Sequence, residues 1–126
     1  MRALRLGIVV AMLGLTACSA TMPPGARVTD IAVLAGTYSG TLKETGMTSR
    51  PVRIVQFPDG SFEITGGEPA GFRFNGRSTV DADGNLVYEY DGAKGRGVVY
   101  EGDGRRVIVL TRADGRVTIT VDKSLP

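Results

Sequence analysis

From Leu34 onward, apolar and polar side chains alternate with a period of two, which is the pattern of strands with one buried face. The run at residues 115–122 shows it clearly, because Val117, Ile119 and Val121 alternate with polar residues. Eight such runs follow one another, near residues 35–44, 51–57, 61–66, 71–80, 85–91, 95–102, 105–112 and 115–122. The pattern therefore predicts an all-β domain over residues 34–126.

Short polar segments with hairpin chemistry separate these runs. Five of them contain an Asp-Gly dipeptide, in which both residue types tolerate the positive φ of tight turns: Asp59-Gly60, Asp83-Gly84, Asp91-Gly92, Asp103-Gly104 and Asp114-Gly115. Strands joined in this way predict an antiparallel up-and-down meander. Pairing of the last strand with the first would remove both exposed edges, so we expect a small closed barrel, with a two-sheet sandwich as the alternative.

Two local features qualify this meander. Asp30 is a suitable N-cap for residues 31–34, where a short helix could close one end of the barrel. Gly76 interrupts the strand predicted near residues 71–80, and an isolated glycine in a strand is typical of a bulge or a bend.

The first residues of the chain have the pattern of an export signal. Arg2 and Arg5 give a positive start, and an apolar stretch of about ten residues, 6–15, follows. This stretch is too short to span a bilayer, which requires about 20 residues.

The stretch ends in Leu15-Thr16-Ala17-Cys18, which resembles the lipobox of bacterial lipoproteins at all four positions. The resemblance implies a signal peptide over residues 1–17, recognised through Leu15, Thr16 and Ala17, and lipidation of Cys18 as a membrane anchor. Ser19 resembles the residue that directs Gram-negative lipoproteins to the outer membrane, facing the periplasm. Residues 18–33, with Pro23-Pro24-Gly25, then form the lipidated N-terminus and a linker.

Composition narrows the possible chemistry. The chain has 15 basic and 13 acidic residues, and removal of Arg2 and Arg5 leaves 13 of each, so no basic excess predicts a nucleic-acid partner. It has no histidine, which is the commonest general base and metal ligand, and its single cysteine rules out an internal disulfide. We therefore expect a protein that is not an enzyme and needs no metal or cofactor.

A second resemblance concerns the first strand. The segment Gly36-Thr37-Tyr38-Ser39-Gly40 is similar to the Gly-x-Trp-x-Gly signature of lipocalins and their calycin relatives, with Tyr38 at the Trp position. The resemblance implies a closed barrel that binds small ligands or proteins. A simpler interpretation is that the two glycines let a strand bend at the end of a barrel.

The aromatic residues supply the candidate binding site. Core filling is the simplest role for them, and the alternative is a pocket in the barrel mouth lined by Tyr38, Phe72, Phe74, Tyr88 and Tyr90. A small apolar ligand or an envelope protein would then be the partner. The alternative function is inhibition of a periplasmic or external hydrolase through barrel-end loops such as 66–71 or 91–95. A ligand carrier requires a cavity, whereas an inhibitor requires a filled core and a protruding loop.

Overall fold

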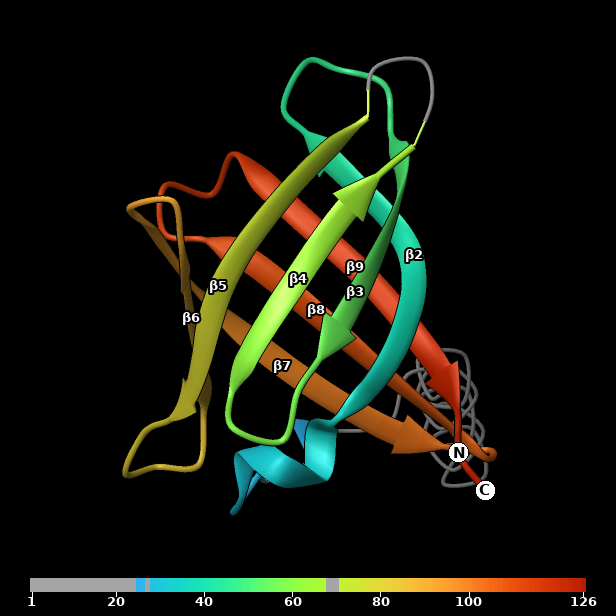
Figure 1. The fold of residues 1–126 in the computed structure, drawn as a ribbon, viewed down its shortest axis with the longest axis vertical. Helices are drawn as coiled ribbons and strands as arrows, with labels where there is room; N and C mark the ends of the chain where they lie inside the picture. Colours follow the sequence, from blue (N-terminus) through green and yellow to red (C-terminus); the bar gives the residue numbers. More distant parts are fainter. Residues whose placement is uncertain (1–24, 27, 68–70) are drawn as a thin grey trace, which may run out of the picture.

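Eight antiparallel strands close into a barrel in the computed structural model, which describes residues 25–26, 28–67 and 71–126 (Figure 1). Each strand pairs with the next along the chain, and the last pairs with the first. The predicted meander and its closure are confirmed, and the two-sheet alternative does not form. The strands are β2 (Gly36–Glu44), β3 (Arg50–Gln56), β4 (Ser61–Gly66), β5 (Phe72–Val80), β6 (Leu86–Tyr90), β7 (Ala93–Gly102), β8 (Arg105–Arg112) and β9 (Val117–Ser124).

A two-residue strand, β1 (Gly25–Ala26), lies in the region expected to be a linker. It pairs with Val99 and Tyr100 of β7, past Gly97, which is the last residue of β7 that pairs with β6. The segment just before the barrel is therefore attached to the barrel wall.

The predicted short helix forms as η1 (Ile31–Leu34), a 3-10 helix whose N-cap side chain, Asp30, accepts the backbone N–H of Ala32 at 3.0 Å. The backbone N–H of Val28 donates to Gly84 in the β5–β6 turn at 3.4 Å. The segment therefore crosses the lower end of the barrel in Figure 1, and the expected closure of one end is confirmed. No helix in the described ranges is long and apolar enough to cross a membrane.

The five Asp-Gly dipeptides occupy turns between strands, as predicted. All five glycines have a positive φ, between 73° and 96°. Asp91 and Asp103 also have a positive φ, because they precede glycine in the two-residue turns on either side of β7.

The inward positions of the alternation form one apolar core. Buried apolar side chains come from every strand of the barrel except β5, whose apolar side chains are partly buried. In β7 the inward set contains Gly95, Gly97 and Val99, whereas Val98 is 43% exposed on the outer face. The buried core comprises Val28, Leu34, Tyr38, Leu42, Val52, Ile54, Phe62, Ile64, Leu86, Tyr88, Val99, Ile108, Leu110, Val117, Ile119 and Val121.

Two glycines allow backbones and rings to approach closely. A Cβ at Gly40 would lie 1.9 Å from the backbone oxygen of Thr120, so the β2–β9 seam requires glycine at this position. A Cβ at Gly76 would lie 2.4 Å from the ring of Phe62. The pairing with β4 runs through Gly76 without an extra residue, and the pairing with β6 reaches Gly76 without one. Of the expected bulge or bend, the bulge is therefore wrong. This glycine makes room for a core ring instead.

A buried arginine joins the closing segment to the barrel. Arg106 is 8% exposed; its Nε donates to Glu101 at 2.6 Å, and its Nη1 donates to the backbone oxygen of Val33 at 2.9 Å. The same Nη1 lies 3.3 Å from the hydroxyl of Tyr38, which donates to the backbone oxygen of Leu34 at 2.8 Å. Burial raises the pKa of Tyr38, so this hydroxyl keeps its proton as a donor. One side chain thus connects η1 to β2, β7 and β8.

Replacing Arg106 with Ala is expected to lower the free energy of unfolding by about 2–3 kcal/mol, because buried partners of a charged group lose their hydrogen bonds. Chemical denaturation measures the change. Arg105→Ala is the matched control, since Arg105 pairs with Asp122 at 3.0 Å on the exposed surface and is expected to cost less than about 1 kcal/mol. Equal losses in the two variants would contradict the connecting role of Arg106.

Candidate functional site

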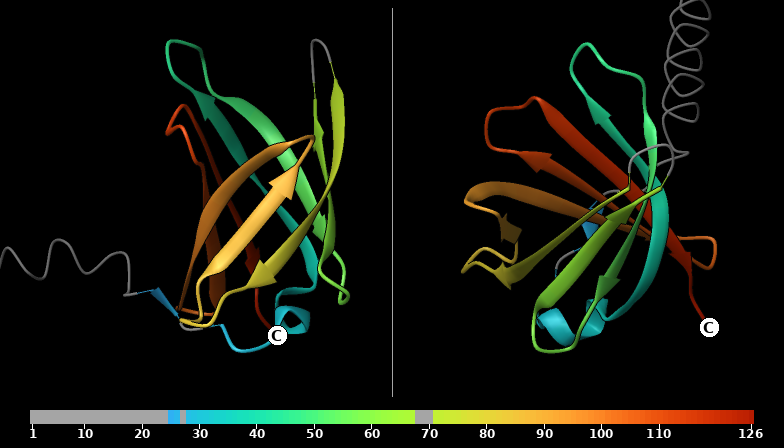
Figure 2. Two further views of the ribbon diagram at one scale, coloured as in Figure 1. Left: turned by 90° about the vertical axis from the view of Figure 1, so that its left-hand side faces the viewer. Right: turned by 45° about the horizontal axis from the view of Figure 1, so that its top comes forward.

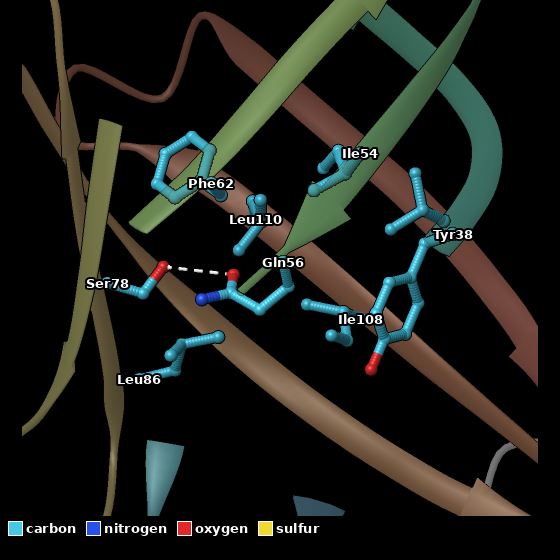
Figure 3. A pocket seen from close by; sticks show the side chains of 9 residues that line it. Tyr38, Ile54, Gln56, Phe62, Ser78, Leu86, Ile108 and Leu110 are labelled. Atoms are coloured by element: carbon cyan, nitrogen blue, oxygen red, sulfur yellow. Dashed lines mark hydrogen bonds between the residues drawn. The ribbon is translucent and has the colours of Figure 1, made fainter. Parts of the chain in front are cut away.

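The interior of the barrel is filled at its closed end. Figure 3 shows the side chains around the central cavity, among them Tyr38, Ile54, Phe62 and Ile108. Its volume is about 10 Å³, which is room for one water molecule at most. A ligand held deep inside the barrel, as in a carrier with a hollow core, does not fit.

Two polar side chains face this apolar interior. Gln56 donates through Nε2 to the backbone oxygen of Ser61 at 3.3 Å, and Ser78 donates to Oε1 of Gln56 at 3.5 Å. Gln56 on β3 and Ser78 on β5 thus bond to each other over the intervening strand β4, as Figure 3 shows. Gln56 lies on the inward face of its predicted strand, so the alternation contained a signal for this pair that the sequence prediction missed.

The opposite end of the barrel is open and holds a pocket of about 460 Å³. It lies where β2, β6 and β8 end and β3, β5, β7 and β9 begin, at the top of Figure 1. We call it the mouth pocket. Its apolar wall is formed by Leu42, Phe72, Phe74, Tyr90 and Val117.

Aromatic rings run continuously from the mouth into the core. The centroids of Phe72 and Phe74 are 5.4 Å apart, and those of Phe74 and Tyr90 are 5.5 Å apart. Tyr90 stacks on Tyr88 at 5.8 Å, and Tyr88 meets Phe62 edge-on at 6.4 Å. Because these separations are typical of interacting aromatic pairs, the wall of the mouth is supported from below by the core.

Charged groups surround the apolar wall. The guanidinium of Arg50 lies 5.4 Å from the centroid of the Phe72 ring, within cation–π range. Arg112 donates to Asp114 through Nε at 3.0 Å and Nη2 at 2.8 Å, and these bonds hold the pKa of Asp114 below its ordinary value. Glu44 and Asp91 complete the charged lining. The mouth pocket therefore offers an aromatic surface beside positive and negative groups, a combination suited to an amphipathic ligand.

The structure divides the five predicted pocket residues into two groups. Phe72, Phe74 and Tyr90 meet in the mouth pocket. Tyr38 and Tyr88 are 0% and 1% exposed and belong to the core, where core filling is their role.

Tyr88 has an unusual environment for a core tyrosine. Its ring packs so closely on Gly95 that a Cβ there would lie 2.5 Å from the hydroxyl oxygen. The hydroxyl is buried and has no hydrogen-bond partner among the described residues. Burial raises the pKa of Tyr88, so the group remains a neutral, unsatisfied hydroxyl.

Sequence reasoning missed the other half of the mouth, including Leu42, Glu44, Arg50, Arg112 and Val117. The signal was present in the alternation. Arg50 and Arg112 lie an even number of residues from buried positions of their own strands, so the alternation places them on the inward face. Both are charged and lie at strand ends. Charged residues at inward positions beside a hairpin are compatible with folding where the barrel opens to water or where, as for Arg106, they have buried partners.

The two barrel-end segments that were predicted to contact an inhibited hydrolase are residues 66–71 and 91–95. Ala93, Lys94 and Gly95 belong to β7, so the proposed loop 91–95 is a tight two-residue turn and does not protrude as a loop. Part of the loop 66–71, at residues 68–70, lies outside the described residues, as do Leu15, Thr16, Ala17 and Cys18. Within the described ranges no three acidic or cysteine side chains gather where they could hold a metal ion.

Known proteins offer no sequence match from which a role for this chain could be inferred. No protein-family model matches the chain, and no curated protein matches it in sequence. The closed antiparallel barrel of eight strands is consistent with a calycin-like barrel.

Replacing Tyr88 with Phe is expected to raise the free energy of unfolding by about 1 kcal/mol, because a buried hydroxyl without a partner costs about 1–3 kcal/mol. Tyr38→Phe is the matched control and is expected to lower stability by a similar amount, since the Tyr38 hydroxyl donates to Leu34 at 2.8 Å. Denaturant titration of both variants measures the two signs. A clear loss of stability in Tyr88→Phe would show that this hydroxyl has a partner.

Proposed function

We propose that this chain is a lipid-anchored protein of the bacterial cell envelope that binds a ligand in its mouth pocket and has no enzymatic activity. The observation that carries the binding role is the pocket of about 460 Å³ with Phe72, Phe74 and Tyr90 on one wall. Binding pockets for small molecules typically have volumes of about 300–1,000 Å³ and combine apolar walls with a few polar groups.

The anchor is supported by the N-terminal sequence. Leu15, Thr16, Ala17 and Cys18 follow a short apolar stretch and match the lipoprotein pattern. One acyl chain gives only marginal membrane binding, and the multiple chains of a lipoprotein would hold the barrel at the membrane stably. Ser19 favours the outer membrane, facing the periplasm, as the location.

The chemistry of the mouth favours a ligand with an apolar or aromatic body and a carboxylate. The rings of Phe74 and Tyr90 offer a surface for stacking. The guanidinium of Arg50, held over Phe72, would pair with the carboxylate at the edge of the same surface. The small internal cavity restricts the ligand to the mouth.

The filled interior also favours an alternative function, inhibition of a hydrolase by contacts at the barrel end. Such a protein needs a rigid barrel and no cavity in its core. The tight turn at Asp91-Gly92 supplies no protruding loop, so the mouth pocket remains the better-supported site.

Replacing Cys18 with Ala is expected to abolish lipidation and shift the protein from the membrane fraction to the soluble or unprocessed fraction. Metabolic labelling with a palmitate analogue, followed by fractionation, measures both effects. Ser19→Ala is the matched control and is expected to keep the lipid. Undiminished labelling of Cys18→Ala would contradict the anchor.

Titration of 2-naphthoate into the purified full chain, followed by calorimetry, tests the mouth pocket. We expect saturable binding that weakens about tenfold in Phe74→Ala, because removal of one stacking ring costs about 1–2 kcal/mol. The matched control is Phe57→Ala, since Phe57 is 45% exposed in the turn before β4, away from the mouth. Equal weakening in both variants, or no saturable binding to the wild-type chain, would contradict the proposal.

A further inference from the structure

One strand of the barrel has an edge beside the mouth pocket that no described strand covers. The ladder between β5 and β6 covers residues 76–80 of β5 and stops at the pair Gly76–Tyr90. The first four residues of β5, 72–75, pair with β4 alone among the described strands. Figure 2 (left) shows β4 and β5 reaching beyond the β6–β7 turn, which leaves this edge open.

The direction of the free backbone groups follows from the register. The N–H of Ser78 donates to Gly60, at the β4 side of β5, and the N–H of Asp81 donates to Asn85, at the β6 side. Successive residues of a strand direct their backbone groups to opposite sides, and the register shows no bulge on either side of β5. Therefore Arg73 and Asn75 direct their N–H and C=O groups to the open side.

The side chains along this edge alternate in the same way. Phe72 and Phe74 face the mouth pocket, and Arg73 and Asn75 are exposed on the outer face. Arg73 also belongs to a row across the outer face that contains Thr65 and Arg53, so this row is positive, whereas Glu63 lies opposite Asn75 in the next row. An added strand would meet an aromatic surface on its inner side and Arg73 and Asn75 on its outer side.

We propose that the partner of this protein is an extended peptide segment that adds as a strand to residues 72–75 of β5 and inserts an apolar side chain into the mouth pocket. The proposal rests on the mouth pocket as the binding site and specifies the class of ligand. The residue opposite Phe74 is apolar and contacts the rings of Phe74 and Tyr90. The residue opposite Arg73 is acidic and lies on the outer face. Backbone hydrogen bonds supply affinity and the alternating side chains supply selectivity, as in other cases of strand addition.

Fluorescence anisotropy of a labelled peptide of alternating glutamate and leucine, titrated with the purified full chain, tests this proposal. Asn75→Pro removes a free N–H and places the proline ring at the open edge. The β4 ladder keeps its hydrogen bonds, because Asn75 pairs with Glu63 at a position where the N–H of Asn75 points away from β4. We expect at least an about tenfold loss of peptide affinity in Asn75→Pro and a change within about twofold in Asn75→Ala, which retains the N–H.

Two further measurements separate the possible outcomes. The same peptide methylated on its backbone nitrogens should fail to bind the wild-type chain, a test that does not depend on the folding of any variant. Retained binding of 2-naphthoate by Asn75→Pro shows that the mouth is intact. Strand addition is overturned if the peptide does not bind the wild-type chain. It is also overturned if Asn75→Pro binds the peptide as tightly as the wild type does, or if the wild-type chain binds the methylated peptide as tightly as the unmethylated one. If strand addition is overturned but 2-naphthoate binds, the mouth pocket remains the binding site. If the peptide binds but 2-naphthoate does not, only the small-ligand role is overturned.

Discussion

The pairing of β2 with β9 is the constraint on which the rest of the barrel depends. It turns an open meander into a ring, and it requires the two backbones to approach so closely at Gly40 that no side chain fits there. Closure gives the apolar alternation of every strand a common interior to fill. Gly40 therefore serves the seam, and Tyr38 serves the core.

Closure leaves two ends, and the protein treats them differently. One end is covered by η1, which Arg106 joins to the wall through Val33, Tyr38 and Glu101. The cavity that remains in the core at that end has room for one water molecule at most. The other end has no covering segment in the described ranges, and there the inward positions carry charge and aromatic rings. This asymmetry confines binding to the mouth.

The short strand β6 connects the fold to the proposed mode of recognition. It has five residues between neighbours of nine and ten, so it cannot cover both of their edges along their whole length. At the lower end, β1 covers the uncovered part of β7. At the mouth, no strand of the described ranges pairs with this part of β5, which lies beside Phe72 and Phe74.

The sequence by itself determined the strands, the turns, the helix cap at Asp30 and the order of pairing, because these depend on local period and local φ preferences. It left open which face of β7 is buried, since Val98 and Val99 suit either face. The tertiary structure decided this through volume: Gly97 lies between Leu86 and Leu110, whose methyl groups fill the space that a side chain there would need. It likewise decided which aromatic residues reach the mouth. Depth along a strand depends on the tilt and register of all its neighbours, which the alternation of one strand does not contain.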